Sequence, residues 1–333
     1  SKKVFDDEEE LKSFNANMTA RYTLGVKHLG SLDGQTILGQ RYTSIPGGYV
    51  IDINDNVQKW CAECGIVFND DTKLPQSPLP VHPDPKDGTA GAEMLDDAAL
   101  TAYKQRVGCL QYGSLVEQTH AFAAWWLGSA CARATKHHWD LTKRAMKSML
   151  RSSKRGLRLI KNMDDDDSRI IQVWSDSNWA QCPTDRRSVS CAYARLFGMP
   201  LFLCVNKQGT VTLASTGAET YSMSQAAKRT LPIRYFCEEL GIKLPPTIMY
   251  VDNQAAKVIA DNHYKLTEMS RHMAVRHLYI RELVQQRVIH LQWVPSPLNL
   301  SDCGTKALDA DKFVDATDGV QGWTSNEDET ESN

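Results

Sequence analysis

Four acidic residues stand where predicted strands end or predicted helices begin in the second half of the chain. Asp176 follows the apolar run 170–174, and Asp252 follows the apolar run 247–251. Glu219 opens a predicted helix, and Asp302 follows the last predicted strand. Strand ends and helix starts meet at one edge of an α/β sheet, so we expect these four carboxylates to lie close together.

Carboxylates that are crowded together repel one another, and a bound divalent cation relieves the repulsion. An oxygen-only ligand set suits Mg²⁺, whereas Zn²⁺ favours His and Cys. Two such ions about 3.5–4 Å apart can activate a water and stabilise the leaving oxygen in phosphodiester hydrolysis. Taken singly, each acid is more simply explained as a solvated helix cap or as an ion-pair partner. Their matching placement favours a metal site, and residues from about 168 onward are predicted to form a nuclease domain.

The elements that position these acids are predicted from apolar periodicity and turn residues. Strands are expected at 170–174, 189–197, 201–205, 247–251 and 288–294. Helices are expected at 222–240, from 253 onward, and from about 270 to 286. This order predicts an α/β fold, a mixed five-stranded sheet with helices on its faces.

The first half of the chain has a different pattern. Residues 35–53 predict a hairpin, residues 54–68 a helix, and the Pro-rich stretch 70–91 an extended connector. Residues 96–132 predict two packed helices, and residues 136–159 one amphipathic helix. The four aspartates at 164–167 indicate a linker, although they are also a possible cation site.

Composition and charge narrow the class of protein. Hydrophobic residues make up 42 % and charged residues 23 %, which is typical of a soluble globular protein. The chain has no apolar run of about 18 residues and no signal peptide, so we expect an intracellular protein with no membrane partner. Residues 133–161 hold ten Lys or Arg against one acid. This excess of positive charge is equally consistent with a surface that binds a polyanion and with one solvated face of a helix. The last ten residues hold four acids and no base, so the tail after Leu308 is expected to be disordered.

The nine cysteines are scattered, and Cys61 and Cys64 form the one closely spaced pair. A structural zinc site needs a second ligand pair, and none follows it. We therefore expect buried thiols in a reducing compartment.

Several short blocks are specific in their residues and in their order along the chain. They lie at 103–108, 138–144, 176–180 with 185–188, 207–208 with 215–219, 251–256, 271–272 with 280–282, and 300–306. In this combination the chain resembles the carboxyl-terminal part of copia-type retrotransposon polyproteins, over most of residues 5–308. That part comprises the end of the reverse transcriptase, followed by ribonuclease H.

The resemblance implies a ribonuclease H fold and an endonuclease that cuts the RNA strand of an RNA–DNA hybrid. It implies two Mg²⁺ ions, with Mn²⁺ able to substitute, held by the catalytic residues Asp176, Glu219, Asp252 and Asp302. It also divides the chain into a mostly helical region at 1–161 that resembles the thumb and connection, an acidic linker at 162–168, a ribonuclease H-like domain at 169–308 and an acidic tail at 309–333.

The sequence departs from the family pattern at several places. Gly217 replaces a glutamate of the block around Glu219, and residues 117–120 differ from the family's upstream motif. The loop 295–298 lacks the His of many ribonucleases H, so His272 is either an auxiliary residue or a structural histidine at a helix start. Residues 250–253 mimic a polymerase motif, but the family's true motif would precede Ser1. We expect no polymerase activity, and the missing fingers and palm are a possible partner.

An RNA–DNA hybrid is close to A-form, so a protein reads it through its minor groove, its 2′-hydroxyls and its phosphates. The residues expected to grip the backbone are Lys143, Lys147 and Arg151 on the basic helix, and Arg186, Arg187 and Lys207 near the acids. Two alternatives stay open. One is a domesticated, non-catalytic module that binds nucleic acid or protein in a larger assembly. The other is an integrase or junction resolvase, although these use three acids in another order and no zinc-binding region is present.

Overall fold

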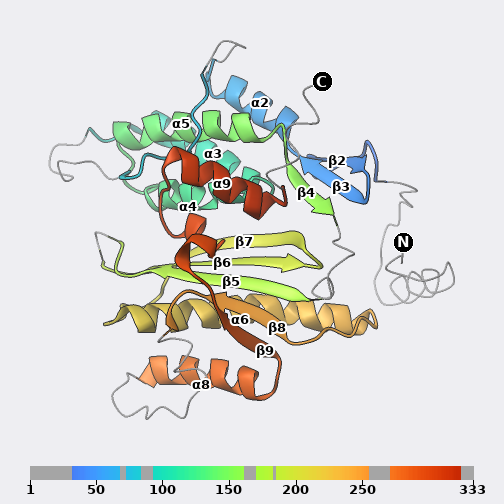
Figure 1. Cartoon of the computed structure of the whole chain (residues 1–333). Coiled ribbons are helices and arrows are strands. Elements are labelled where there is room, and N and C mark those ends of the chain that lie inside the picture. Colours follow the sequence, from blue (N-terminus) through green and yellow to red (C-terminus); the bar gives the residue numbers. More distant parts are fainter. Residues whose placement is uncertain are drawn as a thin grey trace, which may run out of the picture.

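A computed structural model describes residues 32–67, 73–83, 93–160, 170–182, 185–254 and 271–323, without the side chains of 271–273. The predicted linker at 162–168 lies outside the described residues. Figure 1 shows a lower layer built on a five-stranded sheet and an upper layer of helices with a smaller sheet. Among the described helices, none is long and apolar enough to cross a membrane.

The lower sheet has the strand order β7-β6-β5-β8-β9. Its strands are β5 (Ile171–Asn178), β6 (Val189–Leu196), β7 (Met199–Lys207), β8 (Thr247–Val251) and β9 (Ile289–Trp293). β5, β6 and β7 are antiparallel neighbours, whereas β8 is parallel to β5 and β9 is parallel to β8. This confirms the predicted mixed sheet. Because β5 and β8 run in the same direction, their carboxyl ends lie at the same edge.

The main core lies between one face of this sheet and the helices that cover it. α6 (Ser215–Glu239) packs on β5 and β6, and α8 (Arg271–Gln285) packs on α6. Val173, Met223, Met249 and Ile280 are fully buried between them. Each such side chain contributes about 1.5–3 kcal/mol when it leaves water. Ala226 and Ala227 of α6 are buried in the same core, so they also help to hold this helix against the sheet.

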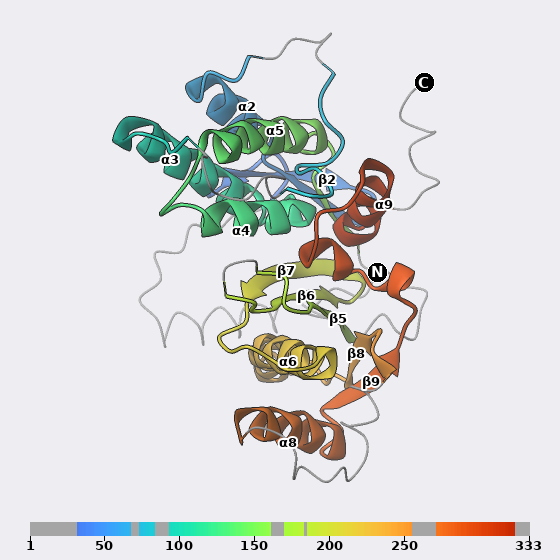
Figure 2. The same ribbon diagram turned by 90° about the vertical axis from the view of Figure 1, so that its left-hand side faces the viewer.

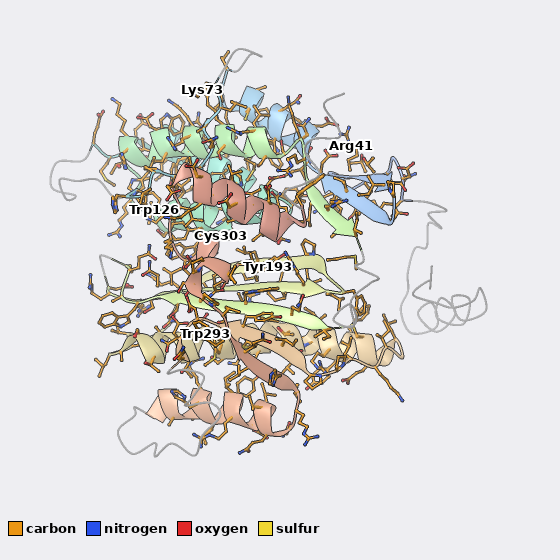
Figure 3. All side chains as sticks on the ribbon, viewed as in Figure 1. Arg41, Lys73, Trp126, Tyr193, Trp293 and Cys303 are labelled. Atoms are coloured by element: carbon orange, nitrogen blue, oxygen red, sulfur yellow. The ribbon has the colours of Figure 1, made fainter. Side chains whose placement is uncertain are left out.

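The opposite face of the sheet is covered by the upper layer rather than by solvent. Tyr193 of β6, Leu203 of β7 and Cys303 are buried in one cluster with Ala121 of α4 (Ala121–Ser129). Figure 3 labels Tyr193 and Cys303 between the sheet and the helices above it. The two layers therefore share a continuous apolar interface.

The upper layer has a four-stranded antiparallel sheet with the order β1-β2-β3-β4. Its elements are β1 (Thr36–Ile37), β2 (Gln40–Ile45), β3 (Gly48–Asp52), α2 (Asn54–Glu63), α3 (Asp97–Gly113), η1 (Gln118–His120), α4, α5 (Lys136–Ser152) and β4 (Leu157–Ile160). The predicted hairpin is β2 and β3. The predicted helix 136–159 is too long, because Gly156 has a φ of +68° and the chain then turns into β4, which pairs with β3.

The tail after Leu308 is partly ordered, so the prediction of disorder is wrong for residues 310–321. They form α9 (Ala310–Gln321), which the Asp309 carboxylate caps by accepting from the Lys312 amide at 3.0 Å. Phe313, Thr317 and Val320 are buried on one face of this helix. The prediction of disorder was based on the four acids of the last ten residues. The buried apolar residues that order α9 lie before these acids in the chain. Residues 324–333 lie outside the described part of the chain.

Candidate metal centre

Three of the four predicted acids converge at the edge where β5 and β8 end. Asp176 lies in β5, Glu219 lies in the second turn of α6, and Asp252 follows β8 directly. Each offers a carboxylate oxygen, and these oxygens all lie within 4.8 Å of one another. Among the described residues, this is the one group of three or more His, Cys, Asp or Glu side chains with such spacing.

The three carboxylates line a pocket of about 460 Å³. Its walls also carry amide and hydroxyl side chains from the ends of β5 and β8 and from the loop after β9, namely Ser177, Asn178, Asn253, Gln254, Ser296 and Thr305. The pocket is therefore lined by polar groups.

Neighbouring hydroxyl groups orient two of the carboxylates. The Ser177 hydroxyl donates to Glu219 Oε1 at 2.9 Å, and the Thr305 hydroxyl donates to Asp176 Oδ2. The Ser222 hydroxyl of α6 donates to the backbone carbonyl of Asp176 at 2.7 Å, which ties the helix to the strand. Sequence reasoning missed these supporting roles, although Thr305 lies in one of the blocks that carry the family resemblance.

Burial and mutual repulsion raise the pKa values of two of the acids, Asp176 and Glu219. Burial, with smaller contributions from Asp302 and Asp252, raises the pKa of Asp176 to about 7. Burial and the Asp176 carboxylate raise the pKa of Glu219 well above its usual value. Two buried carboxylates with such shifts are costly when both are ionised, and a cation between them would remove the cost.

The residues present fit a hard divalent cation. Glu219 Oε2 is buried and accepts no hydrogen bond from any residue that the structure describes. The convergent groups are carboxylate oxygens only, which is the ligand set of Mg²⁺ and Mn²⁺. A buried oxygen without a donor, in a carboxyl group beside two other acids, is consistent with a ligand position for a cation.

Asp302, the fourth predicted acid, lines the same pocket but stands apart from the other three. It begins η5 (Asp302–Gly304), and Lys306 one turn later pairs with its carboxylate at 2.7 Å. The sequence placed this acid at the correct edge. Its ion pair was not predicted.

The predicted backbone-gripping residues divide into two groups. Arg187 and Lys207 both pair with Asp185, at 3.7 and 2.9 Å, while the neighbouring Arg186 is exposed. On α5, Lys143 pairs with Asp140, and Lys147 lies close enough to Cys61 of α2 to lower the pKa of that thiol slightly, against the larger effect of burial. Arg151 instead lines a cavity that faces α9. The His272 side chain lies outside the described residues.

Fold and site together define an α/β protein with a mixed five-stranded sheet that carries an acidic triad at its edge. No protein-family model matches the chain. The sequence is 27 % identical over 235 residues to the retrovirus-related Pol polyprotein from transposon RE1 of Arabidopsis thaliana, which covers 70 % of this chain and 16 % of the relative. It is 28 % identical to the RE2 polyprotein of the same plant, over 62 % of this chain and 14 % of the relative.

A third relative is the Pol polyprotein from transposon TNT 1-94 of Nicotiana tabacum, 24 % identical over 66 % of this chain and 16 % of the relative. The homologues are thus retrovirus-related Pol polyproteins of plant transposons, which confirms the predicted resemblance. The chain spans about a sixth of the length of these relatives.

Two solved structures align with parts of the chain. LC11-RNase H1 in complex with RNA/DNA hybrid aligns with a TM-score of 0.31 and 13 % identity, over 39 % of this chain and 88 % of that protein. The foamy viral protease-reverse transcriptase in complex with RNA/DNA hybrid aligns with a TM-score of 0.41 and 9 % identity, over 83 % of this chain and 31 % of that protein.

Proposed function

We propose that residues 169–308 are a ribonuclease H that hydrolyses the RNA strand of an RNA–DNA hybrid as part of a reverse transcriptase. The observation that carries the proposal is the convergence of Asp176, Glu219 and Asp252 from three separate elements, with one buried carboxylate oxygen lacking a hydrogen-bond donor among the described residues. The Pol polyprotein relatives support the reverse transcriptase context.

Asp176, Glu219 and Asp252 would hold Mg²⁺, and Asp302 would complete the ligand set from the pocket wall. When bound, such ions supply the charge that activates a water and stabilises the leaving oxygen of the cleaved phosphodiester. The protein's own groups orient the ligands. Ser177 fixes one oxygen of Glu219, and Thr305 fixes one oxygen of Asp176, so neither carboxylate has to reorganise when the substrate arrives.

The pocket walls supply the recognition of the substrate. Side chains of Asn178, Gln254 and Ser296 border the acids and offer hydrogen-bond donors and acceptors. A 2′-hydroxyl is both a donor and an acceptor, and it is the group that distinguishes RNA from DNA. Such a border offers hydrogen-bond partners for the 2′-hydroxyls of an RNA strand, which a DNA strand lacks.

The test is Mg²⁺-dependent cleavage of a hybrid in which either strand is labelled, with Asp252→Asn measured beside the wild type. We expect cut RNA, an intact DNA strand and no product from the variant. Asp311→Asn is the matched control, because Asp311 is exposed on α9 and does not line the pocket. Binding without cleavage would favour the domesticated module, and cleavage of duplex DNA in place of hybrid would favour an integrase or resolvase.

A further inference from the structure

Gly304 lies where the short helix η5 packs against the lower sheet. η5 contacts β6 and β7 on one side and α4 and η1 on the other. In Figure 2 the chain from β9 to α9, drawn in orange to red, passes from the lower sheet to the upper layer. η5 is therefore enclosed by elements of both layers, and Gly304 itself is buried.

A side chain at position 304 would have no space. A Cβ atom there would lie 2.2 Å from Cys191 Sγ and 2.9 Å from Cys191 Cβ of β6, and 3.2 Å from Leu203 Cδ2 of β7. The first two distances are well inside van der Waals contact, which is about 3.5–4.0 Å between carbon atoms. Cys191 is buried in the cluster between the two layers, so it has little room to move away. Glycine at position 304 therefore lets η5 lie directly on Cys191.

Cys191 is the sheet neighbour of the proposed metal ligand Asp176. The two residues are paired directly across the antiparallel strands β6 and β5, so their side chains lie on the same face of the sheet. The Ser222 hydroxyl of α6 lies 2.7 Å from the backbone carbonyl of Asp176 and 3.3 Å from that of Cys191. Gly304 therefore rests on a part of the sheet whose position relative to Asp176 is fixed.

Thr305, the next residue along the chain, connects this contact to the Asp176 carboxylate. Its hydroxyl donates to Asp176 Oδ2 and lies 3.1 Å from the backbone carbonyl of Asp302. The backbone carbonyl of Thr305 accepts from the Asn178 side chain at 3.4 Å. Because Gly304 and Thr305 are adjacent, a shift of η5 away from β6 would also move the Thr305 hydroxyl away from the carboxylate.

We propose that Gly304 is a positioning residue of the metal centre and that it acts through Thr305. Its missing side chain sets the distance between η5 and β6, and this distance holds the Thr305 hydroxyl on Asp176 Oδ2. The inference rests on the proposed function, because it concerns the same carboxylates, and it adds a residue that offers no ligand atom of its own. Loss of a group that orients a metal ligand typically weakens metal binding about 10- to 100-fold.

The test is the affinity for Mn²⁺, measured by calorimetry on the whole chain without nucleic acid. Gly304→Ala should bind Mn²⁺ about 10-fold more weakly than the wild type, or weaker still. Thr305→Val replaces the hydroxyl by a methyl group and should give a loss of similar size, whereas Thr305→Ser should keep most of the affinity. Gly108→Ala is the matched control, because a Cβ atom at that position of α3 meets no atom within 4 Å.

Two double variants separate positioning from general damage to the fold. Gly304→Ala combined with Thr305→Val should bind Mn²⁺ about as weakly as Thr305→Val alone, because the hydroxyl is already gone. Gly304→Ala combined with Cys191→Gly, the exchanged pair, should regain affinity, because the second change removes both atoms that the new methyl group meets first. Glycine weakens a strand, so urea denaturation in chelator checks that each variant is folded.

The proposal is overturned if Gly304→Ala binds Mn²⁺ like the wild type, or if its loss adds in full to that of Thr305→Val. If Gly304→Ala alone does not fold, the exchanged pair decides: affinity near that of the wild type supports the proposal, and a folded pair as weak as Thr305→Val overturns it. Cleavage of hybrid is measured separately. The expected Mn²⁺ pattern without cleavage rejects the proposed nuclease alone, whereas a wild type that binds no Mn²⁺ overturns both.

Discussion

Replacing Asp176 with Asn should stabilise the protein in the absence of metal, although it removes a proposed catalytic residue. Burial raises the pKa of Asp176 from 3.8 to about 7 in the folded state. A group whose folded pKa is raised contributes stability below its unfolded pKa and loses that contribution as pH rises through its folded pKa. The window of loss therefore runs from about pH 4 to about pH 7.

The size of the effect follows from the shift. About three pKa units at 1.36 kcal/mol each give about 4 kcal/mol, as an upper estimate, because the neighbouring acids share the repulsion. Asn keeps a carbonyl oxygen that can accept from the Thr305 hydroxyl, so the variant retains this hydrogen bond. Above pH 7 in chelator, we expect the variant to be more stable than the wild type by up to about 4 kcal/mol.

The assay is urea denaturation at several pH values, in chelator and in Mg²⁺. The wild type should lose stability from acidic to neutral pH in chelator and regain it in Mg²⁺, whereas Asp176→Asn should respond weakly to both. Asp185→Asn is the matched control, and its effect on stability should have the opposite sign. Hydrogen bonds from Cys182 and Lys207 lower the pKa of Asp185, so the ionised carboxylate stabilises the fold there. A variant at position 176 that is less stable than the wild type in chelator at neutral pH would refute the reasoning.

Four other substitutions test particular contacts and one backbone conformation. Lys306→Met frees the Asp302 carboxylate from its 2.7 Å ion pair, so Mn²⁺ should bind more tightly by calorimetry, and an unchanged affinity would contradict this role. Phe313→Ala removes the buried aromatic anchor of α9 and should cost about 3–5 kcal/mol in urea denaturation, whereas a disordered tail predicts no change. Gly48→Ala places a Cβ 1.9 Å from the Leu159 carbonyl and should lower the melting temperature, while Gly65→Ala meets no atom within 4 Å and tests the cost of a positive φ alone.

Local pattern was sufficient for the elements and for the edge at which the acids meet. The runs before Asp176 and Asp252 are apolar and β-branched, so their strand character follows from side-chain chemistry. β8 ends at Val251 as predicted, whereas β5 continues through Asp176 to Asn178, beyond the predicted end at 174. The carboxylates at matching strand ends then predict one shared edge, which the parallel pairing of β5 and β8 confirms. The resemblance to Pol polyproteins depended on short blocks of residues and was equally available from the sequence.

Contacts between distant segments were not predictable in this way. Composition predicted a disordered tail, but α9 is ordered because Phe313 packs on His120 of η1 and Val320 is buried beside Tyr193 of β6. A one-dimensional pattern does not contain these contacts. The length of α5 was overestimated because β4 follows it, and β4 exists only where β3 offers an edge with which it can pair.

The sequence by itself determined which residues carry charge, and it predicted the strands of the lower sheet and the meeting of four acids at one edge of that sheet. It did not give the start of α6, which begins at Ser215 rather than at residue 222. The tertiary structure decided which three acids converge, which hydroxyl groups hold them and which acid pairs with Lys306. It also decided that Arg151 faces a cavity while Lys147 lies near α2. The physical reason is that side-chain identity and period are local properties, whereas burial, repulsion and hydrogen bonding depend on segments that meet only after folding.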